Sequence, residues 1–326
     1  MRLLVTGGAG YIGGVVVARL VAAGHEVTVA DDLSGGFADV VPVGVTLAQV
    51  SVHNIAAVLT PAAAYDGVLH FAGKIAAGES VQHPERYWHA NVTASLALLD
   101  AMRRAGTPRL VFSSSAAVYG NPVGVPITED AAAAPTSPYG WTKLAVDMAI
   151  KHECAAHGLG AASLRYFNVA GAAHAADGRI LGERHHPETH LIPIALEVAA
   201  GLRERLEIFG TDYPTADGTC IRDYIHVEDL ATAHLLALDA VQAGRNAVIN
   251  LGNGTGFSNR EVVEVVRAVT GAAVPLKPAP RRPGDPAALV AASERARAEL
   301  GWLPSKPDLP DIVADAWAFL RSNGPS

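Results

Sequence analysis

The stretch RLLVTGGAGYIGG, residues 2–14, decides the fold of this chain. Its first five residues form a short apolar run typical of a buried strand, and an apolar helical stretch follows at residues 15–23. Between them Gly8, Gly10 and Gly13 match the pattern GxGxxG. Glycine permits a tight turn and the close approach of a pyrophosphate to the backbone. The stretch therefore predicts the strand, turn and helix of a dinucleotide-binding motif.

A second strand, expected at residues 26–30, ends in Asp31 and Asp32. These acids stand about 20 residues beyond the glycines, where a carboxylate accepts hydrogen bonds from an adenosine ribose. The loop at residues 33–37 contains no Arg or Lys to neutralise a ribose phosphate. The expected cofactor is therefore NAD rather than NADP.

Apolar runs and helical patterns continue to alternate along the chain. Strand-like runs at 68–71, 109–113 and 162–166 are separated by helical patterns at 84–105 and 139–157. This alternation predicts an α/β fold, a Rossmann-type doubly wound parallel sheet covered by helices.

The length of 326 residues exceeds what one core usually organises, so two lobes are expected. The pattern changes to long loops after Asn168, which places an NAD-binding domain at 1–168 and a smaller C-terminal α/β substrate domain at 169–326. The buried run 247–251 is expected to return to the first sheet as a strand. The proline-rich segment 275–286 is expected to be an irregular surface loop or a substrate-binding arm.

Composition limits the partners. The formal net charge is −7, which argues against nucleic acid or an anionic membrane surface as the main partner. No apolar run reaches the roughly 18 residues of a membrane span. Cys154 and Cys220 offer no disulfide framework and no metal-ligand spacing, which is compatible with a reducing compartment. We expect a cytoplasmic protein without nucleic-acid or membrane partners.

Tyr139 and Lys143 stand four residues apart, so on a helix they share one face. Ser137 is expected to cap that helix and Pro138 to occupy its first turn. Tyrosine has an ordinary pKa of about 10, and a neighbouring cation stabilises its phenolate. The pair therefore predicts a general base, although one such pair is also typical of an ordinary helix surface.

Seven segments together resemble the extended short-chain dehydrogenase/reductase family, and within it the UDP-glucose 4-epimerases (UDP-galactose 4-epimerases). The segments are VTGGAGYIGG (5–14), HFAGKIAAGES (70–80), FSSSAAVYG (112–120), SPYGWTK (137–143), LRYFNVAGA (164–172), IFGTDYPTADGTCIRDYIHVEDL (208–230) and PRRPGD (280–285). The first and fourth are common to the whole superfamily. The last two are much more specific for nucleotide-sugar 4-epimerases, and the resemblance covers nearly the whole chain.

The resemblance implies NAD-dependent interconversion of UDP-glucose and UDP-galactose, through oxidation at C4, rotation of a 4-keto sugar and re-reduction. Tyr139 is then the base for the 4-hydroxyl. Lys143 lowers the pKa of that tyrosine and holds the nicotinamide ribose, and Ser115 bonds the reacting oxygen. The resemblance also implies a homodimer.

The resemblance further assigns binding residues. For the cofactor they are Gly7, Gly10, Tyr11, Ile12, Gly13, Asp31, Asp32, Phe71, Ala72, Gly73, Asn91, Ser113, Tyr139, Lys143 and Tyr166. For the UDP-sugar they are Ser115, Tyr139, Asn168, His190, Leu191, Phe209, Arg222, Arg282, Asp285 and Leu289. Arg222 and Arg282 present planar forks that suit a pyrophosphate, and Leu289 stands where a side chain limits the size of the sugar.

Some positions depart from the commonest family pattern. Ala117 stands where a threonine often assists the reacting oxygen, and Ser51 where an aspartate usually contacts the adenine. A UDP-N-acetylhexosamine or UDP-pentose 4-epimerase remains an alternative. A nucleotide-sugar 4,6-dehydratase is less favoured, because alanines rather than an acid/base pair follow Ser115. A non-catalytic dinucleotide-binding module is disfavoured by the intact Ser115, Tyr139 and Lys143.

A metal site is not expected. His152 and His157 are five residues apart, which does not suit the four-residue spacing of a zinc helix. His185, His186 and His190 cluster in a segment broken by proline, but no acidic or cysteine residue is recognised at ligand spacing.

Overall fold

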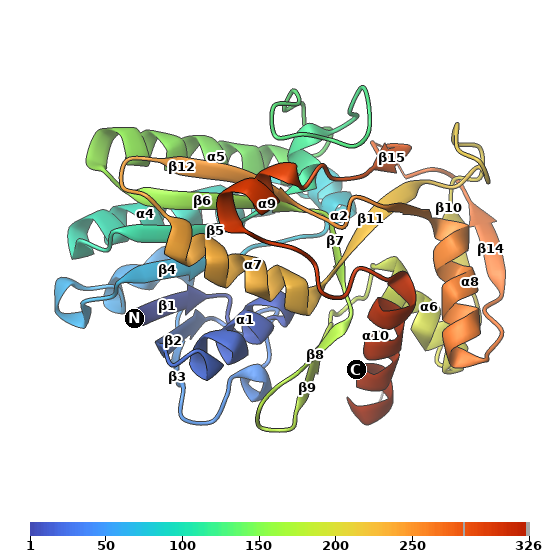
Figure 1. The fold of residues 1–326 in the computed structure, drawn as a ribbon, viewed down its shortest axis with the longest axis horizontal. Coiled ribbons are helices and arrows are strands. Elements are labelled where there is room, and N and C mark those ends of the chain that lie inside the picture. The colour runs from blue at the N-terminus through green and yellow to red at the C-terminus, as the bar shows by residue number, and fades with distance from the viewer. Residues whose placement is uncertain (283, 324–326) are drawn as a thin grey trace.

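A seven-stranded parallel sheet forms the centre of the molecule, in a computed structural model that describes residues 1–282 and 284–323. Its strands are arranged in the order β12-β6-β5-β4-β1-β2-β3 (Figure 1). Their bounds are Arg2–Thr6 (β1), Glu26–Asp31 (β2), Thr46–Gln49 (β3), Gly67–His70 (β4), Arg109–Ser115 (β5), Gly160–Tyr166 (β6) and Asn246–Leu251 (β12). The expected Rossmann-type sheet is confirmed.

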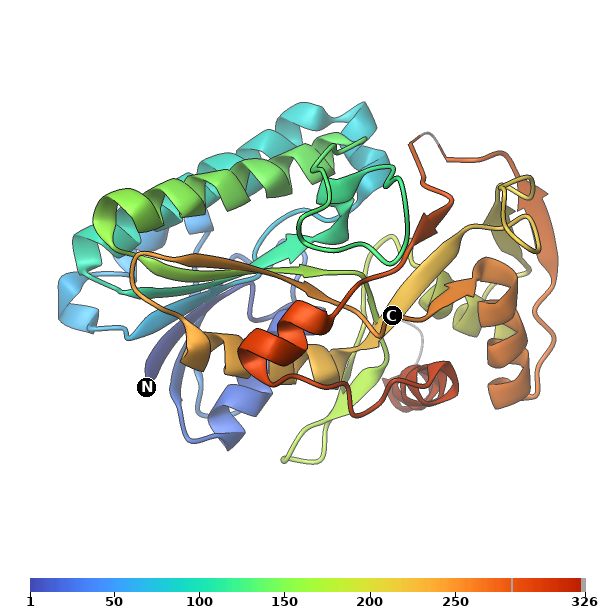
Figure 2. The ribbon, with the colours of Figure 1, turned by 45° about the horizontal axis from the view of Figure 1, so that its top comes forward.

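Helices cover both faces of this sheet because its strands are apolar on both sides. Leu3 and Val5 of β1 pack with the core beneath α1 and α7, whereas Leu4 packs with the core beneath α4 and α5. Figure 2 shows these two helical layers on opposite sides of the strands. The four helices are Tyr11–Ala22 (α1), Ala94–Ala105 (α4), Pro138–His157 (α5) and Val227–Ala240 (α7).

A second lobe is built around the strand β11, Ile221–His226. It pairs with β7 and β15 in parallel and with β13 in antiparallel fashion. Beside it, β10 and β14 form a two-stranded sheet, and α6, α8 and α10 bury a separate apolar core. The elements are Asn168–Ala170 (β7), Leu206–Phe209 (β10), Gly256–Ser258 (β13), Leu276–Ala279 (β14), Ala288–Leu289 (β15), Leu191–Ala199 (α6), Asn259–Thr270 (α8) and Leu309–Asn323 (α10).

Short elements complete the chain. They are the helices Ala77–Gln82 (α2), Pro84–Tyr87 (α3) and Glu294–Leu300 (α9) and the strands Ala172–His174 (β8) and Ile180–Gly182 (β9). The 3₁₀ helices are Ala38–Val40, Val52–Ala57, Pro61–Ala63 and Ala116–Tyr119, and a π-helical turn lies at Trp88–Thr93. Across 1–282 and 284–323, no helix has both the length and the apolarity needed to cross a membrane.

Two segments of the C-terminal half pack with the first sheet, whereas the sequence indicates only one. The strand β12 pairs with β6 as expected, but α7 also packs against α1 on the face of that sheet. The last three residues of the expected substrate domain, 324–326, lie outside the described residues.

The expectation of an irregular segment at 275–286 is wrong at its beginning. Residues Leu276–Ala279 form β14, which pairs in parallel with β10 and includes Pro278. Proline is tolerated here because β14 has only one neighbouring strand, so one side of its backbone needs no ladder partner.

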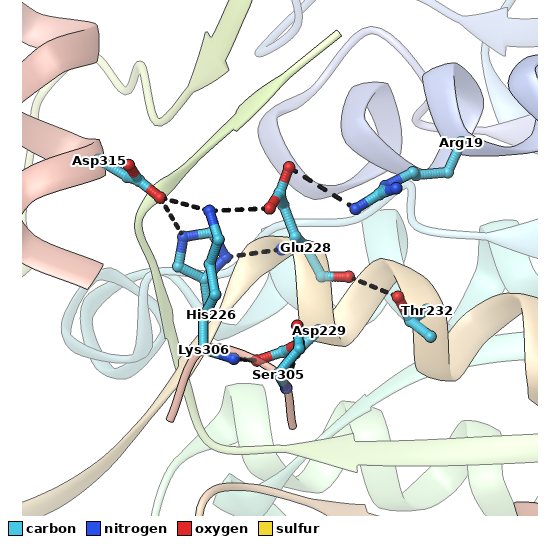
Figure 3. Close-up of polar contacts among 8 residues, drawn as sticks. All are labelled: Arg19, His226, Glu228, Asp229, Thr232, Ser305, Lys306 and Asp315. Atoms are coloured by element: carbon cyan, nitrogen blue, oxygen red, sulfur yellow. Dashed lines mark hydrogen bonds and ion pairs between the residues drawn. The ribbon is translucent and has the colours of Figure 1, made fainter. Parts of the chain in front are cut away.

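Asp229 joins the chain before α10 to α7. Its buried carboxylate accepts hydrogen bonds from the backbone N–H of Ser305 (2.8 Å), the Ser305 hydroxyl (2.6 Å) and the backbone N–H of Lys306 (2.9 Å). The Lys306 ammonium then pairs with Glu228 at 2.9 Å and with Asp315 of α10 at 2.7 Å (Figure 3). This polar network connects helices that are distant in sequence.

Replacing Asp229 by Ala should destabilise the protein by about 2–4 kcal/mol, because three donors lose a charged acceptor in a buried place. Chemical denaturation measures the loss. The matched control is Asp239→Ala on the same helix, where the side chain is exposed and the change should be within about 0.5 kcal/mol. If both substitutions change the free energy of unfolding equally, the hydrogen bonds of Asp229 do not contribute to stability as proposed.

Candidate active site

The glycine turn between β1 and α1 is too tight for side chains. A Cβ added at Gly13 would lie 2.2 Å from the carbonyl oxygen of Gly7, and Gly7 itself has φ +73°. Gly10 is the N-cap of α1. The turn therefore leaves the positive end of the helix open to an anionic ligand, as a dinucleotide pyrophosphate requires.

Asp31 lies beside this turn at the end of β2. Its carboxylate accepts hydrogen bonds from the backbone N–H of Ala9 (3.0 Å) and of Leu33 (2.9 Å). Burial raises the pKa of Asp31, while these two backbone bonds act to lower it. Asp32 is exposed. A carboxylate at this place, with no Arg or Lys in the loop 33–37, fits a dinucleotide whose adenosine ribose carries no phosphate.

The residues expected to be catalytic meet at the carboxyl end of β5. The helix α5 begins as predicted, with the Ser137 hydroxyl accepting a hydrogen bond from the Gly140 N–H at 3.2 Å. Tyr139 lies in its first turn, and the side chain of Ser115 acts to lower the pKa of its phenol. One turn later, the Lys143 ammonium donates to the carbonyl of Ser113 at 2.8 Å and lies 5.9 Å from the centre of the Tyr139 ring.

Burial dominates the electrostatics of Tyr139 and Lys143. Burial raises the pKa of Tyr139, and the side chain of Ser115 only partly opposes this effect. Burial also lowers the pKa of Lys143 to about 8. The ammonium is bonded to a β5 carbonyl rather than to the phenol, so desolvation outweighs the attraction between cation and phenolate.

Asp147, one turn beyond Lys143, was missed by sequence reasoning. Its buried carboxylate pairs with Arg165 at 3.0 Å and accepts a hydrogen bond from Ser114 at 3.1 Å. Its charge acts to raise the pKa of Lys143, against the effect of burial. The repeated spacing of four residues, 139, 143 and 147, was the available signal, since it continues one helix face.

Asn91, assigned to the cofactor by resemblance, lies in the π-helical turn. Its side chain exchanges hydrogen bonds with the backbone of Lys74 at 2.8 and 3.0 Å and donates to the hydroxyl of Thr142 at 3.0 Å. Asn91 therefore holds the loop after β4, which includes Gly73, against α5. Single π turns often mark functional sites.

Further cofactor residues assigned by resemblance gather at the same sheet edge. Phe71 follows β4, and Tyr166 ends β6. Both rings contact His234 of α7, at centroid distances of 4.8 and 5.9 Å. The Tyr166 hydroxyl is also hydrogen-bonded to Ser113. The strand order reverses between β1 and β4, and ligands of doubly wound sheets bind at such a switch point.

Apart from Ser115 and Tyr139, the substrate residues assigned by resemblance lie on the second lobe. Arg222 of β11 pairs with Asp285 at 2.6 Å, and the guanidinium of Arg282 lies 4.1 Å from the centre of the Phe209 ring. Leu289 pairs in register with Arg222 and packs against the apolar cluster around the turn after β5. The remaining assigned residues are Asn168 at the start of β7, His190 at the N-cap of α6 and Leu191 in its first position.

Ala117, which departs from the family pattern, still contacts the assigned serine. The backbone N–H of Ala117 donates to the Ser115 hydroxyl at 3.1 Å, so it helps to orient that serine although it has no hydroxyl. The expectation that no acidic residue lies at ligand spacing around these histidines is wrong, because Glu183 and Glu188 lie beside His185 and His190.

Comparisons with known proteins agree with this geometry. The sequence model of the NAD dependent epimerase/dehydratase family matches residues 3–252. The chain belongs to this family. It is 52% identical over 324 residues to a UDP-glucose 4-epimerase of Corynebacterium glutamicum, covering 99% of this chain and 97% of that protein. It is 54% identical over 325 residues to a UDP-glucose 4-epimerase of Streptomyces lividans, with the same coverage.

A solved structure of the family has a closely similar fold. The UDP-glucose 4-epimerase of Stenotrophomonas maltophila, crystallised with NAD and formylated UDP-arabinopyranose, superposes with a TM-score of 0.91. It is 41% identical in sequence, and the match covers 99% of this chain and 98% of that one. The resemblance drawn from the sequence motifs is confirmed.

Replacing Asp147 by Asn should lower the pKa of Lys143 below about 8, because the substitution removes the charge that favours the ammonium and leaves Arg165 unpaired. NMR titration of lysine labelled at Cε measures this pKa. Glu153→Gln, on the exposed end of α5, is the matched control and should leave it unchanged. If the pKa of Lys143 is the same in both variants and in the wild type, the charge of Asp147 has no effect on Lys143.

Proposed function

We propose that this protein is an NAD-dependent enzyme that interconverts UDP-glucose and UDP-galactose by inverting C4 of the sugar. The observation that carries the proposal is the meeting of Ser115, Tyr139 and Lys143 between the glycine turn and the second lobe. A base for a sugar hydroxyl thus stands where a dinucleotide and a nucleotide-sugar can approach it from opposite sides. Membership of the NAD dependent epimerase/dehydratase family supports the same chemistry.

The chain offers a complete set of groups for NAD. We assign the pyrophosphate to the glycine turn, the adenosine ribose to Asp31, and the nicotinamide half to the edge that includes Phe71, Lys143 and Tyr166. NAD supplies a group that accepts a hydride from C4 and returns it within the same cycle, and its positive charge favours a nearby phenolate.

Tyr139 takes the proton of the sugar 4-hydroxyl as C4 is oxidised, and it returns a proton when the 4-keto sugar is reduced. Ser115, whose side chain acts on the pKa of Tyr139, is assigned to the same oxygen and would keep it in line with the phenol. Inversion requires the keto sugar to present its other face, and the sugar must turn while the diphosphate stays in place. Arg222 and Arg282 are the cations that we assign to the diphosphate.

The second lobe must therefore bind the nucleotide firmly and the sugar loosely. The Arg222–Asp285 pair and the stacking of Arg282 on Phe209 provide a polar and aromatic surface for UDP. Leu289, next to Arg222 in register, is apolar and forms no directional contact with a sugar hydroxyl. An apolar wall of this kind suits a ring that has to rotate.

We also propose a homodimer in the cytoplasm. Four large apolar side chains are exposed on neighbouring helices: Trp88 and Leu96 near α4, and Trp141 and Met148 on α5. The two helices pack side by side, as Figure 2 shows, so they present one apolar surface that a second copy can cover. Both cysteines are buried and unpaired, which suits a reducing compartment.

Tyr139→Phe should reduce turnover of UDP-galactose by roughly 10²–10⁴-fold, because the base is removed, while bound NAD is retained. Product formation is followed with purified enzyme, and the NAD content is measured after denaturation. Tyr65→Phe is the matched control, since Tyr65 is buried before β4 at the opposite end of the sheet. Near-normal turnover of Tyr139→Phe, or NADH accumulating in step with product in the wild type, would refute the proposed cycle.

Leu289→Tyr should suppress conversion of UDP-N-acetylgalactosamine roughly tenfold more than conversion of UDP-galactose. Leucine is smaller than the tyrosine that excludes a 2-acetamido group in related enzymes, and the wild type should convert the N-acetylated sugar slowly but measurably. Both rates are measured for wild type, Leu289→Tyr and the exposed control Leu303→Tyr. If Leu289→Tyr changes both rates equally, Leu289 does not limit the size of the sugar.

A further inference from the structure

The loop between β9 and α6 brings four metal-ligand side chains together: Glu183, His185, Glu188 and His190. One ligand atom from each lies within 4.8 Å of the others. The histidines contribute Nδ1, which in both cases faces carboxylate oxygens. His190 is also assigned to the UDP-sugar by resemblance, whereas Glu183, His185 and Glu188 have no role in the proposed catalytic cycle or the NAD site.

The two carboxylates are deeply buried. The side chains of Glu183 and Glu188 are only 6% and 5% exposed. In the part of the chain that the structure describes, neither forms an ion pair with Lys or Arg, and their charged-group partners are the two histidines. Two buried negative charges need compensation, either from two imidazolium protons or from one divalent cation.

The spacing of the ligand atoms suits a small ion. Zinc binds nitrogen and oxygen at about 2.0–2.2 Å in tetrahedral geometry, which places neighbouring ligand atoms about 3.3–3.6 Å apart. The Nδ1 of His185 lies 3.1 Å from Glu183 and 3.7 Å from Glu188, and the Nδ1 of His190 lies 3.9 Å from Glu188. The Nδ1 of His190 is also directly hydrogen-bonded to Glu183, so these two side chains must separate for both to bind an ion. Small side-chain adjustments would centre an ion among them.

The surroundings orient the ligands and give access to them. The Glu188 carboxylate also accepts hydrogen bonds from the backbone N–H groups of Thr189 (2.7 Å) and His190 (2.8 Å), which hold it in place. Both carboxylates line a cavity of about 400 Å³, whose other walls include Phe319 of α10. This cavity offers the ion a path to the site.

We propose that Glu183, His185, Glu188 and His190 bind one divalent transition-metal ion per chain, with zinc the best match to two imidazoles and two carboxylates. The ion has a structural role. It holds residues 183–190 closed directly before α6, so it sets the position of the segment that continues into Leu191.

The test uses the full-length, untagged protein after treatment with a chelator. Zn²⁺ binding is measured by isothermal titration calorimetry, and Co²⁺ binding by the visible absorption typical of four-coordinate sites. Glu183→Gln and His185→Ala each remove one ligand and should weaken Zn²⁺ binding on the order of 100-fold or more. His186→Ala is the matched control, because His186 belongs to the same segment but not to the cluster.

The proposal requires one Zn²⁺ per chain in wild type and His186→Ala, a higher Tm with Zn²⁺ in both, and loss of both effects in Glu183→Gln and His185→Ala. Circular dichroism and the content of bound NAD show whether each variant is folded. Two ligand variants are used, so the test still holds if one of them misfolds. Absence of stoichiometric Zn²⁺ binding in the wild type, or equal affinity in all four proteins, would overturn the proposal. The cluster would then be a protonated ion-pair network.

Discussion

Parallel pairing of the seven central strands is the constraint on which the site depends. Because the strands run in one direction, their carboxyl ends lie at one edge of the sheet. The glycine turn after β1, Asp31 at the end of β2, Phe71 after β4 and Tyr166 at the end of β6 therefore meet although long helices separate them in sequence. The proposed function depends on this edge, because the dinucleotide is assigned to it and Tyr139 lies at the start of α5.

Burial and charge oppose each other along α5. Lys143 is almost fully buried, and desolvation favours its neutral form, with a pKa of about 8. The Ser113 carbonyl and the nearby charge of Asp147 act to keep it protonated. Asp147 is in turn compensated by Arg165 of β6, at 3.0 Å. Lys143, Asp147 and Arg165 therefore form a series of charged groups that reaches from α5 into the sheet beside Tyr139, the proposed base.

The second lobe is tied to the first through its strands and through polar contacts. The strand β11 runs from Arg222, in the proposed substrate surface, to His226, and α7 follows directly on the face of the first sheet. Lys306 and Asp315 connect α7 to α10 (Figure 3). These links give the lobe that carries the proposed UDP surface a defined position relative to the catalytic edge.

Local patterns determined much of the protein. The glycine turn, the acid at the end of β2, the cap of α5 by Ser137 and the spacing of Tyr139 and Lys143 are short-range features. The sequence alone therefore predicts the Rossmann-type sheet and the start of the helix that carries the proposed base. These features succeed because backbone geometry and helix periodicity depend on neighbouring residues.

Tertiary structure decided the rest. Nothing local shows that α7 returns to the first sheet, that Pro278 lies in an edge strand, or that Arg165 pairs with Asp147. Burial by distant segments also raises the pKa of Tyr139, and the spacing of Tyr139 and Lys143 does not reveal this effect. Long-range packing sets both desolvation and charge pairing, and therefore the electrostatics of this site are a property of the folded chain rather than of its motifs.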